Sequence, residues 1–126
     1  MKWLEKYADT AYALLRIMAG LMFAFHGAQK LLGLFGQARP PAGTQLWFAG
    51  IIELFGGLAI MLGLGTRLAA LICSGEMAVA YFQVHWKFQL NSQFFPLVNQ
   101  GELAALYCFV FLLVFFRGSV KWSVGK

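Results

Sequence analysis

The stretch that decides the fold is Ala13-Leu-Leu-Arg-Ile-Met-Ala-Gly-Leu-Met-Phe-Ala-Phe-His-Gly-Ala-Gln-Lys-Leu-Leu32, an apolar run that also carries Arg16, His26 and Lys30. A charged side chain inside a bilayer costs about 2.5–3.5 kcal/mol even on the lenient insertion scale, so it normally faces a partner or a wet cavity. At about 100° per residue, the three polar side chains fall within about 80° of one another on a helix. The run therefore predicts a membrane helix with one polar stripe, which acids on later helices should face.

The composition places the whole chain in the membrane class. Of its 126 residues, 60% are hydrophobic, 17% aromatic and only 12% charged, whereas a soluble domain carries about 25% charged residues. The net charge of +5 comes from basic residues that lie between apolar runs, which is typical of a topology signal rather than a nucleic-acid patch. Cys73 and Cys108 lie inside apolar runs and form no Cys-x-x-Cys pair, so no disulfide framework is indicated.

Apolar runs separated by Gly, Pro and polar residues predict the secondary structure. We expect an all-α integral membrane protein, a bundle of four transmembrane helices in one domain over residues 1–126. The predicted helices cover 10–32, 45–62, 66–86 and 99–117. The first has about 23 residues and a length of roughly 34 Å, enough to cross a bilayer core of about 30 Å. Thr44, Thr66 and Asn99 are the expected helix caps, with Asn99 and Glu102 at capping-box spacing.

Basic residues predict the orientation of the four helices. An even number of spans puts both termini on one side, together with the turn before Arg67. That side collects six basic residues: Lys2, Lys6, Arg67, Arg117, Lys121 and Lys126. The opposite side has Arg39 and Lys87, or three basic residues if Lys30 is counted. The positive-inside rule therefore predicts that both termini are cytoplasmic.

Three acids lie on three different later helices, namely Glu53, Glu76 and Glu102. Such acids can neutralise the cations of the first helix. Because an arginine side chain can span about one helical turn of depth, we predict a structural ion pair between Arg16 and Glu76. Buried pairs of this kind fix helix packing more often than they carry chemistry.

A second group of polar residues falls in the predicted outer half of the bundle. We predict that His26 and Glu53 exchange protons with a ligand and that Lys30 binds the ligand's polar head. Small residues one turn away from these positions are assigned as ligand-binding walls, namely Gly27, Gly50 and Gly57. Haem ligation by His26 and His85 is a further interpretation that no motif supports, and no metal site is predicted.

Three segments carry a resemblance to a known family. They are Leu15-Arg16…Gly20…Phe23…His26-Gly27…Lys30-Leu31, Gly50…Glu53…Gly56-Gly57…Gly63…Thr66-Arg67, and Gly75-Glu76. Together they resemble the DoxX family of small four-helix bacterial membrane proteins. The resemblance implies a multi-pass protein of the bacterial inner (cytoplasmic) membrane. It also implies an association with quinol oxidases and with membrane redox or thiol-stress complexes.

Three functions remain open at the level of the sequence. The first is a quinone- or quinol-linked redox component, in which no cofactor is encoded and a partner protein supplies the electron carrier. The second is a non-catalytic membrane subunit of a redox or stress-response complex. The third is a small proton-coupled transporter, which would act as a homo-oligomer. The expected partners are thus the lipid bilayer, a quinone, redox proteins or a second copy of the chain.

Overall fold

The computed structural model describes residues 1–36, 39–86 and 101–125. In this part of the chain every regular element is helical. The elements in order are α1 (Lys2–Glu5), α2 (Ala8–Leu32), the 3-10 turn η1 (Leu34–Gly36), α3 (Gln45–Ile51), the π-helical turn η2 (Ile52–Gly56), α4 (Gly57–Leu62), α5 (Thr66–Ala80), the π-helical turn η3 (Tyr81–Trp86) and α7 (Glu102–Arg117).

These elements lie over the ranges expected from the apolar runs. α2 begins at Ala8 rather than at residue 10, while α3, η2 and α4 follow one another directly over 45–62. α5 and η3 together cover 66–86. α7 begins at Glu102, and the expected cap Asn99 lies outside the described residues.

Two of the helix ends follow ordinary capping chemistry and one departs from the prediction. The Thr44 side chain accepts a hydrogen bond from the backbone N–H of Trp47, as expected for an N-cap. Gly63 ends α4 in the left-handed conformation, with φ at 76°, which glycine adopts without strain. The prediction that Thr66 caps α5 was wrong: Gly65 is the cap, and the Thr66 hydroxyl is 2.6 Å from that of Ser119.

Glycines bring α2 against the α3–η2–α4 segment. A Cβ atom placed on Gly20 would lie 2.6 Å from the carbonyl oxygen of Gly57, and one on Gly57 would lie 2.6 Å from the carbonyl oxygen of Gly20. Gly27 is similarly closed off by the backbone of Leu54 and by Gly50. Small residues allow this close backbone approach in membrane helices, so these glycines determine how the first two long helical segments pack.

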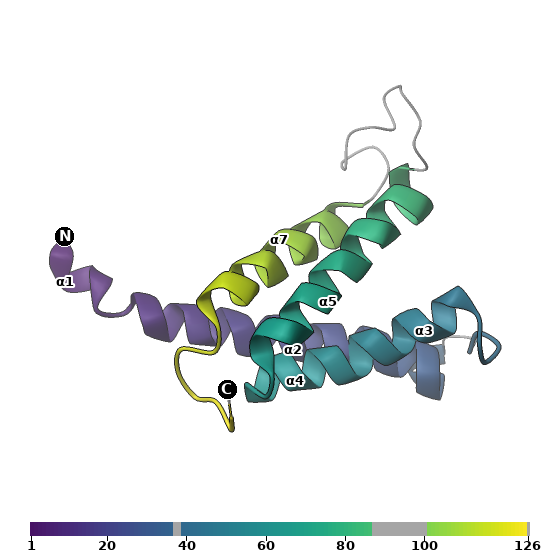
Figure 1. The fold of residues 1–126 in the computed structure, drawn as a ribbon, viewed down its shortest axis with the longest axis horizontal. Helices are drawn as coiled ribbons and strands as arrows, with labels where there is room; N and C mark the ends of the chain where they lie inside the picture. Colours follow the sequence, from purple (N-terminus) through teal and green to yellow (C-terminus); the bar gives the residue numbers. More distant parts are fainter. Residues whose placement is uncertain (37–38, 87–100, 126) are drawn as a thin grey trace.

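The described helices form two pairs that diverge from one end. α2 packs against α3, η2 and α4, and α5 packs against α7. Figure 1 shows that the pairs meet near the turn between α4 and α5 and separate towards the opposite end. Near the crossing, the Phe23 ring lies 4.8 Å from Phe111 and 5.1 Å from Tyr107, measured between centroids. This aromatic cluster joins α2 to α7.

The helix surfaces suit a lipid environment. Large apolar side chains are exposed along the helices, among them Leu14, Met18, Phe55, Leu68, Leu106, Phe109 and Phe116. A soluble monomer rarely exposes so much contiguous apolar surface. Among the described residues, Lys2–Leu32 and Gln45–Leu62 are both long and apolar enough to cross a bilayer.

Arg16 does not form the predicted pair with Glu76. Its guanidinium, which is fully buried, donates to the carbonyl oxygens of Ile60 (2.5 Å) and Met61 (3.0 Å) at the end of α4. It also donates to the carbonyl oxygens of Lys121 (2.6 Å) and Trp122 (3.0 Å). The last carbonyls of a helix lack intrahelical partners and carry partial negative charge, so they take the place of the expected carboxylate.

Candidate functional site: a polar cavity between the helix pairs

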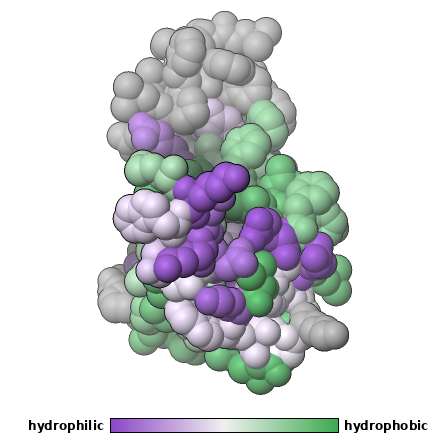
Figure 2. All heavy atoms as spheres, turned by 90° about the vertical axis from the view of Figure 1, so that its left-hand side faces the viewer, coloured by the Kyte–Doolittle hydropathy of each residue, from purple (hydrophilic) through white to green (hydrophobic). Residues whose placement is uncertain are grey.

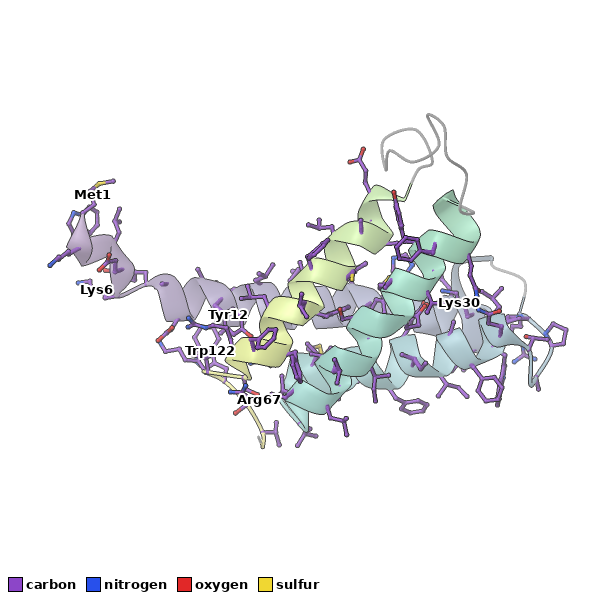
Figure 3. All side chains as sticks on the ribbon, turned by 45° about the horizontal axis from the view of Figure 1, so that its top comes forward. Met1, Lys6, Tyr12, Lys30, Arg67 and Trp122 are labelled. Atoms are coloured by element: carbon purple, nitrogen blue, oxygen red, sulfur yellow. The ribbon has the colours of Figure 1, made fainter. Side chains whose placement is uncertain are left out.

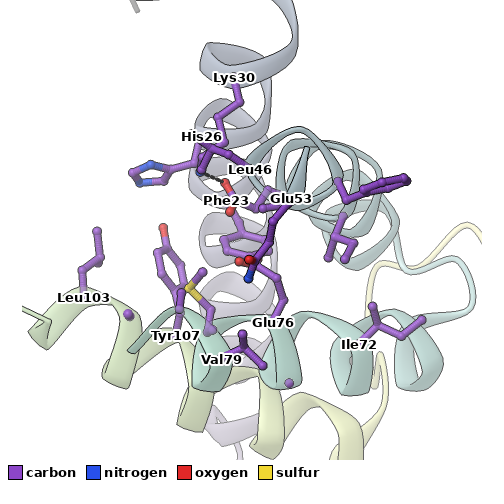
Figure 4. Close-up of a pocket in the computed structure, with 18 residues that line it drawn as sticks. Phe23, His26, Lys30, Leu46, Glu53, Ile72, Glu76, Val79, Leu103 and Tyr107 are labelled. Carbon is purple, nitrogen blue, oxygen red and sulfur yellow. Dashed lines mark hydrogen bonds and ion pairs between the residues drawn. The ribbon is translucent and has the colours of Figure 1, made fainter. Parts of the chain in front are cut away.

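A cavity of about 790 Å³ lies between the two helix pairs. Most of its lining is apolar and comes from α2, the α3–η2 segment, α5 and α7. Its polar lining residues are His26, Lys30, Gln45, Glu53, Glu76 and Tyr107. Figure 4 shows five of them, His26, Lys30, Glu53, Glu76 and Tyr107, on helices far apart in the sequence. The volume falls in the range of small-molecule sites, which are mostly apolar with a few polar groups that orient the ligand.

Glu53 lies on the π-helical turn η2, beside Gly56 and Gly57. Two consecutive glycines weaken the α-helix, and π turns occur often at functional sites because they redirect a side chain. The Glu53 residue is only 2% exposed. Lys30 donates to its Oε1 at 2.5 Å, so the buried carboxylate has a compensating charge.

A second carboxyl group lies next to this pair. Glu76 points from α5 towards Glu53 (Figure 4), and the two carboxyl groups are close enough to interact. The Oε1 atom of Glu76 is buried and has no hydrogen-bond partner among the described residues. The cavity therefore holds two carboxyl groups against one ammonium, with one acceptor atom unsatisfied.

Tyr107 places an unsatisfied hydroxyl at the same cavity. Its side chain is buried, and its Oη has no hydrogen-bond partner within the part of the chain that the structure describes. The ring lies 6.2 Å from that of His26 in an edge-on arrangement. It also stacks on Phe111, with centroids 5.5 Å apart, and these contacts hold the hydroxyl end towards α2 (Figure 4).

His26 lines the cavity but does not face Glu53. The His26 imidazole points away from the Glu53 carboxylate (Figure 4). The Lys30 ammonium, in contrast, donates a hydrogen bond to that carboxylate. His26, Lys30 and Glu53, the three polar residues selected from the sequence, therefore do line one cavity. Their proton exchange with a ligand stays a prediction.

The three glycines assigned as ligand-binding are not among the residues that line the cavity. Gly27 and Gly57 face the backbone of the neighbouring helix, and Gly50 faces Lys30 Cβ and the Leu31 side chain. They do not line this cavity because an adjacent helix fills the space that each glycine leaves, and their role in ligand binding stays a prediction.

Sequence reasoning missed Tyr107 and placed Glu76 with the wrong partner. Tyr107 lies within an aromatic and aliphatic run, so nothing in the sequence distinguishes it from a packing residue. Glu76 lies on one helical face with Cys73 and Gln83, and that polar face was the available signal. The Gln83 amide oxygen accepts a hydrogen bond from Gln45 at 2.6 Å, which ties η3 to α3 beside the cavity.

Cysteine and metal chemistry have no visible site in the described residues. Cys73 and Cys108 are free thiols. The Cys73 thiol lies 3.9 Å from the carbonyl oxygen of Ile52, and the Cys108 carbonyl accepts from Ser74 at 2.8 Å. Within 1–36, 39–86 and 101–125, no group of three His, Cys, Asp or Glu side chains could hold a metal ion. The polar side chains that line the cavity carry carboxyl, ammonium, imidazole, amide and phenol groups.

A comparison with protein-family models identifies the family of this chain. The DoxX family model matches residues 11–86, which include α2, the α3–η2–α4 segment and α5. An uncharacterized protein of Haemophilus influenzae is 43% identical over 123 residues, covering 94% of this chain and 91% of its own length. No solved structure matches the chain. With its apolar helices and exposed apolar surface, this chain is a helical membrane protein, and it belongs to the DoxX family.

Proposed function

We propose that this protein is a quinone- or quinol-linked membrane redox component whose cavity holds the polar head of the ligand. Two buried polar atoms support this function most directly: Oε1 of Glu76 and Oη of Tyr107, both without a partner among the described residues. An unsatisfied buried polar atom costs about 1–3 kcal/mol. Both residues line the same cavity, so a ligand with a donor and an acceptor could satisfy both groups.

The chemistry of these groups fits a quinol and quinone head group. A carboxylate accepts a hydrogen bond from a quinol hydroxyl, and a phenol donates one to a quinone carbonyl. Oxidation of a bound quinol releases protons and electrons together. We assign proton acceptance to the Glu76 carboxyl in concert with Glu53, because Lys30 already balances one negative charge there. The electrons pass to an electron-accepting redox partner protein.

The hydrophobic tail of the ligand would extend out of the cavity between the two helix pairs. Apolar residues dominate the cavity lining, among them Leu46, Ile72, Val79 and Leu103. The cavity lies between the two helix pairs, and the pairs diverge towards one end of the bundle (Figure 1). A hydrophobic tail lying between the pairs could therefore reach the acyl region of the bilayer without passing through water.

We propose that all four helical segments cross the bacterial inner membrane with both termini in the cytoplasm. Arg67, Arg117 and Lys121 lie at the end of the bundle where the pairs meet, the same end as the N-terminus, and Lys30 lies at the opposite end (Figure 3). Basic residues favour the cytoplasmic side, so the ligand cavity would lie in the outer half of the bilayer.

A non-catalytic membrane subunit is the second candidate. The Lys30–Glu53 ion pair is the observation that favours it, because a closed pair holds α2 to η2 without any ligand. In that case the cavity residues would contribute only to the stability of the bundle.

The test is ligand binding by the purified protein in nanodiscs, measured as thermal stabilisation by a short-tail ubiquinol or menaquinol analogue and as quinone co-extracted from the native membrane. Tyr107→Phe and Glu76→Gln should each weaken binding by about tenfold, the equivalent of one lost hydrogen bond of about 1.4 kcal/mol. Tyr7→Phe and Glu102→Gln change the same residue types at exposed positions outside the cavity and should bind normally.

Absence of stabilisation by any quinone analogue in the unmodified protein would refute the redox function. Loss of stability without any ligand effect in Glu76→Gln would favour the non-catalytic subunit.

A further inference from the structure

A second hollow, of about 630 Å³, lies at the opposite end of the bundle from the ligand cavity. It is formed by the first turn of α5 and the segment that follows α7. Its polar lining consists of Thr66, Arg67, Arg117, Ser119 and Ser123, and no acid lines it. The charged side chains on its walls are therefore all cationic, and its hydroxyl groups can donate hydrogen bonds.

The two guanidinium groups are anchored and still have donors to spare. Arg67 donates to the carbonyl oxygens of Phe115 (3.1 Å) and Phe116 (2.8 Å), which fixes it at the end of α7. Arg117 reaches Asp9 at 2.7 Å through one terminal nitrogen. A guanidinium has five N–H donors in a planar fork, so each arginine can bind a phosphate oxygen while it keeps these contacts.

Hydroxyl groups and backbone amides add neutral donors beside the arginines. Thr66 is 1% exposed, and its hydroxyl shares one hydrogen bond of 2.6 Å with Ser119. Two hydroxyls carry two protons, so one remains to be donated to a ligand. α5 also begins here at Thr66 without a side-chain cap, which leaves amide groups of its first turn to face an anion.

The surroundings of the hollow combine a polar end with apolar flanks. Figure 2 shows hydrophilic residues gathered at the end of the molecule that carries the N-terminus and the segment after α7. Leu68, which lines the hollow, and Phe116, beside Arg117 in the sequence, are 65% and 67% exposed. Trp122, exposed at the same end (Figure 3), is a residue type that concentrates at the membrane interface.

From this arrangement we infer that the hollow between α5 and the segment after α7 binds the phosphate head group of an anionic phospholipid. The phosphate oxygens accept from Arg67, Arg117 and the Thr66–Ser119 hydroxyl pair. The acyl chains lie along the exposed apolar side chains of α5 and α7. Zwitterionic lipids bind less well, because their choline or ethanolamine cation would meet two arginines with no acid lining the hollow.

The experiment uses the full chain in phosphatidylcholine nanodiscs with increasing fractions of phosphatidylglycerol, and native mass spectrometry counts the phosphatidylglycerol retained per protein. Arg117→Gln should lower this retention about fivefold, which corresponds to about 1 kcal/mol for one basic group near an anionic lipid. Lys6→Gln removes the same charge at the same end of the molecule but outside the hollow, so it is the matched control and should retain the lipid.

Ser119→Ala keeps every charge, and it is the second test variant in case Arg117→Gln does not fold. It should also weaken retention, because it removes part of the hydroxyl pair. Equal loss in Lys6→Gln and Arg117→Gln, or no preference for phosphatidylglycerol in the unmodified protein, would overturn the site. Displacement of the lipid by millimolar inorganic phosphate would overturn its assignment to a phospholipid.

Discussion

Replacing Arg16 with methionine should release the segment that follows α7. The guanidinium is fully buried and makes four hydrogen bonds to backbone carbonyls. Bonds from a charged donor contribute about 1.5 kcal/mol each at the low end of their range, which sums to about 6 kcal/mol. Removing a buried charge returns several kcal/mol of desolvation cost. The expected net loss in the free energy of unfolding is therefore about 2–4 kcal/mol.

Reversible unfolding in mixed dodecyl sulfate micelles measures this loss, and hydrogen exchange locates it. The backbone amides of Val124 and Gly125 donate to Leu62 and Gly63, and both should lose protection in Arg16→Met. Lys121→Met is the matched control. Its ammonium contacts Thr10 at the surface, so its effect should stay within about 0.5 kcal/mol.

The same experiment distinguishes carbonyl anchoring from an ion pair. If Arg16 balanced Glu76, the double variant Arg16→Met, Glu76→Gln would regain much of the stability lost in Arg16→Met. The structure instead predicts that the two effects add. Rescue in the double variant, or unchanged exchange at Val124, would refute this reasoning.

Three further outcomes follow from the packing, the buried charge and the proposed topology. Gly57→Ala should lower the free energy of unfolding by about 1–3 kcal/mol, because its Cβ would lie 2.6 Å from the α2 backbone; Gly75→Ala, where nothing lies within 4 Å, should not destabilise the protein. Lys30→Met should cost about 3–5 kcal/mol by leaving Glu53 unpaired, and adding Glu53→Gln should restore much of it; unchanged stability in the single variant would contradict a structural role for the pair. A cysteine in place of Arg39 should react with an impermeant thiol reagent in intact cells, whereas labelling only after lysis would reverse the proposed topology.

The helices were predictable because their signals are local. Apolar runs of membrane length predict the helical segments, and glycines that follow these runs predict where the helices end. Gly33 and Gly63 do end helices, and both have positive φ in the structure. These features depend on neighbouring positions along the chain, which a single sequence displays.

The hydrogen-bond partner of Arg16 was not predictable, because the sequence does not show which backbone groups a side chain will contact. Arg16 binds backbone carbonyls, and every residue has a carbonyl. Counting acids and bases therefore assigned it to Glu76, the remaining acid at a similar depth. Tyr107 was missed for a related reason: its hydroxyl becomes notable only when three-dimensional packing leaves it buried without a partner.

The hydrogen bonds of Arg16 also determine when, during translation, the first long helix can be fixed in the bundle. Its acceptors at Lys121 and Trp122 lie 105 and 106 residues further along the chain, so the ribosome makes them long after the first helix has reached the translocon. Until then the guanidinium can reach only the carbonyl oxygens of Ile60 and Met61 at the end of α4, which supply half of its final hydrogen bonds. Arg117 and Lys121, which contact Asp9 and Thr10, join the same late step. The first long helix to be synthesised is therefore among the last to complete its contacts. Nascent chains stalled before residue 118 should remain accessible to membrane quality-control proteases.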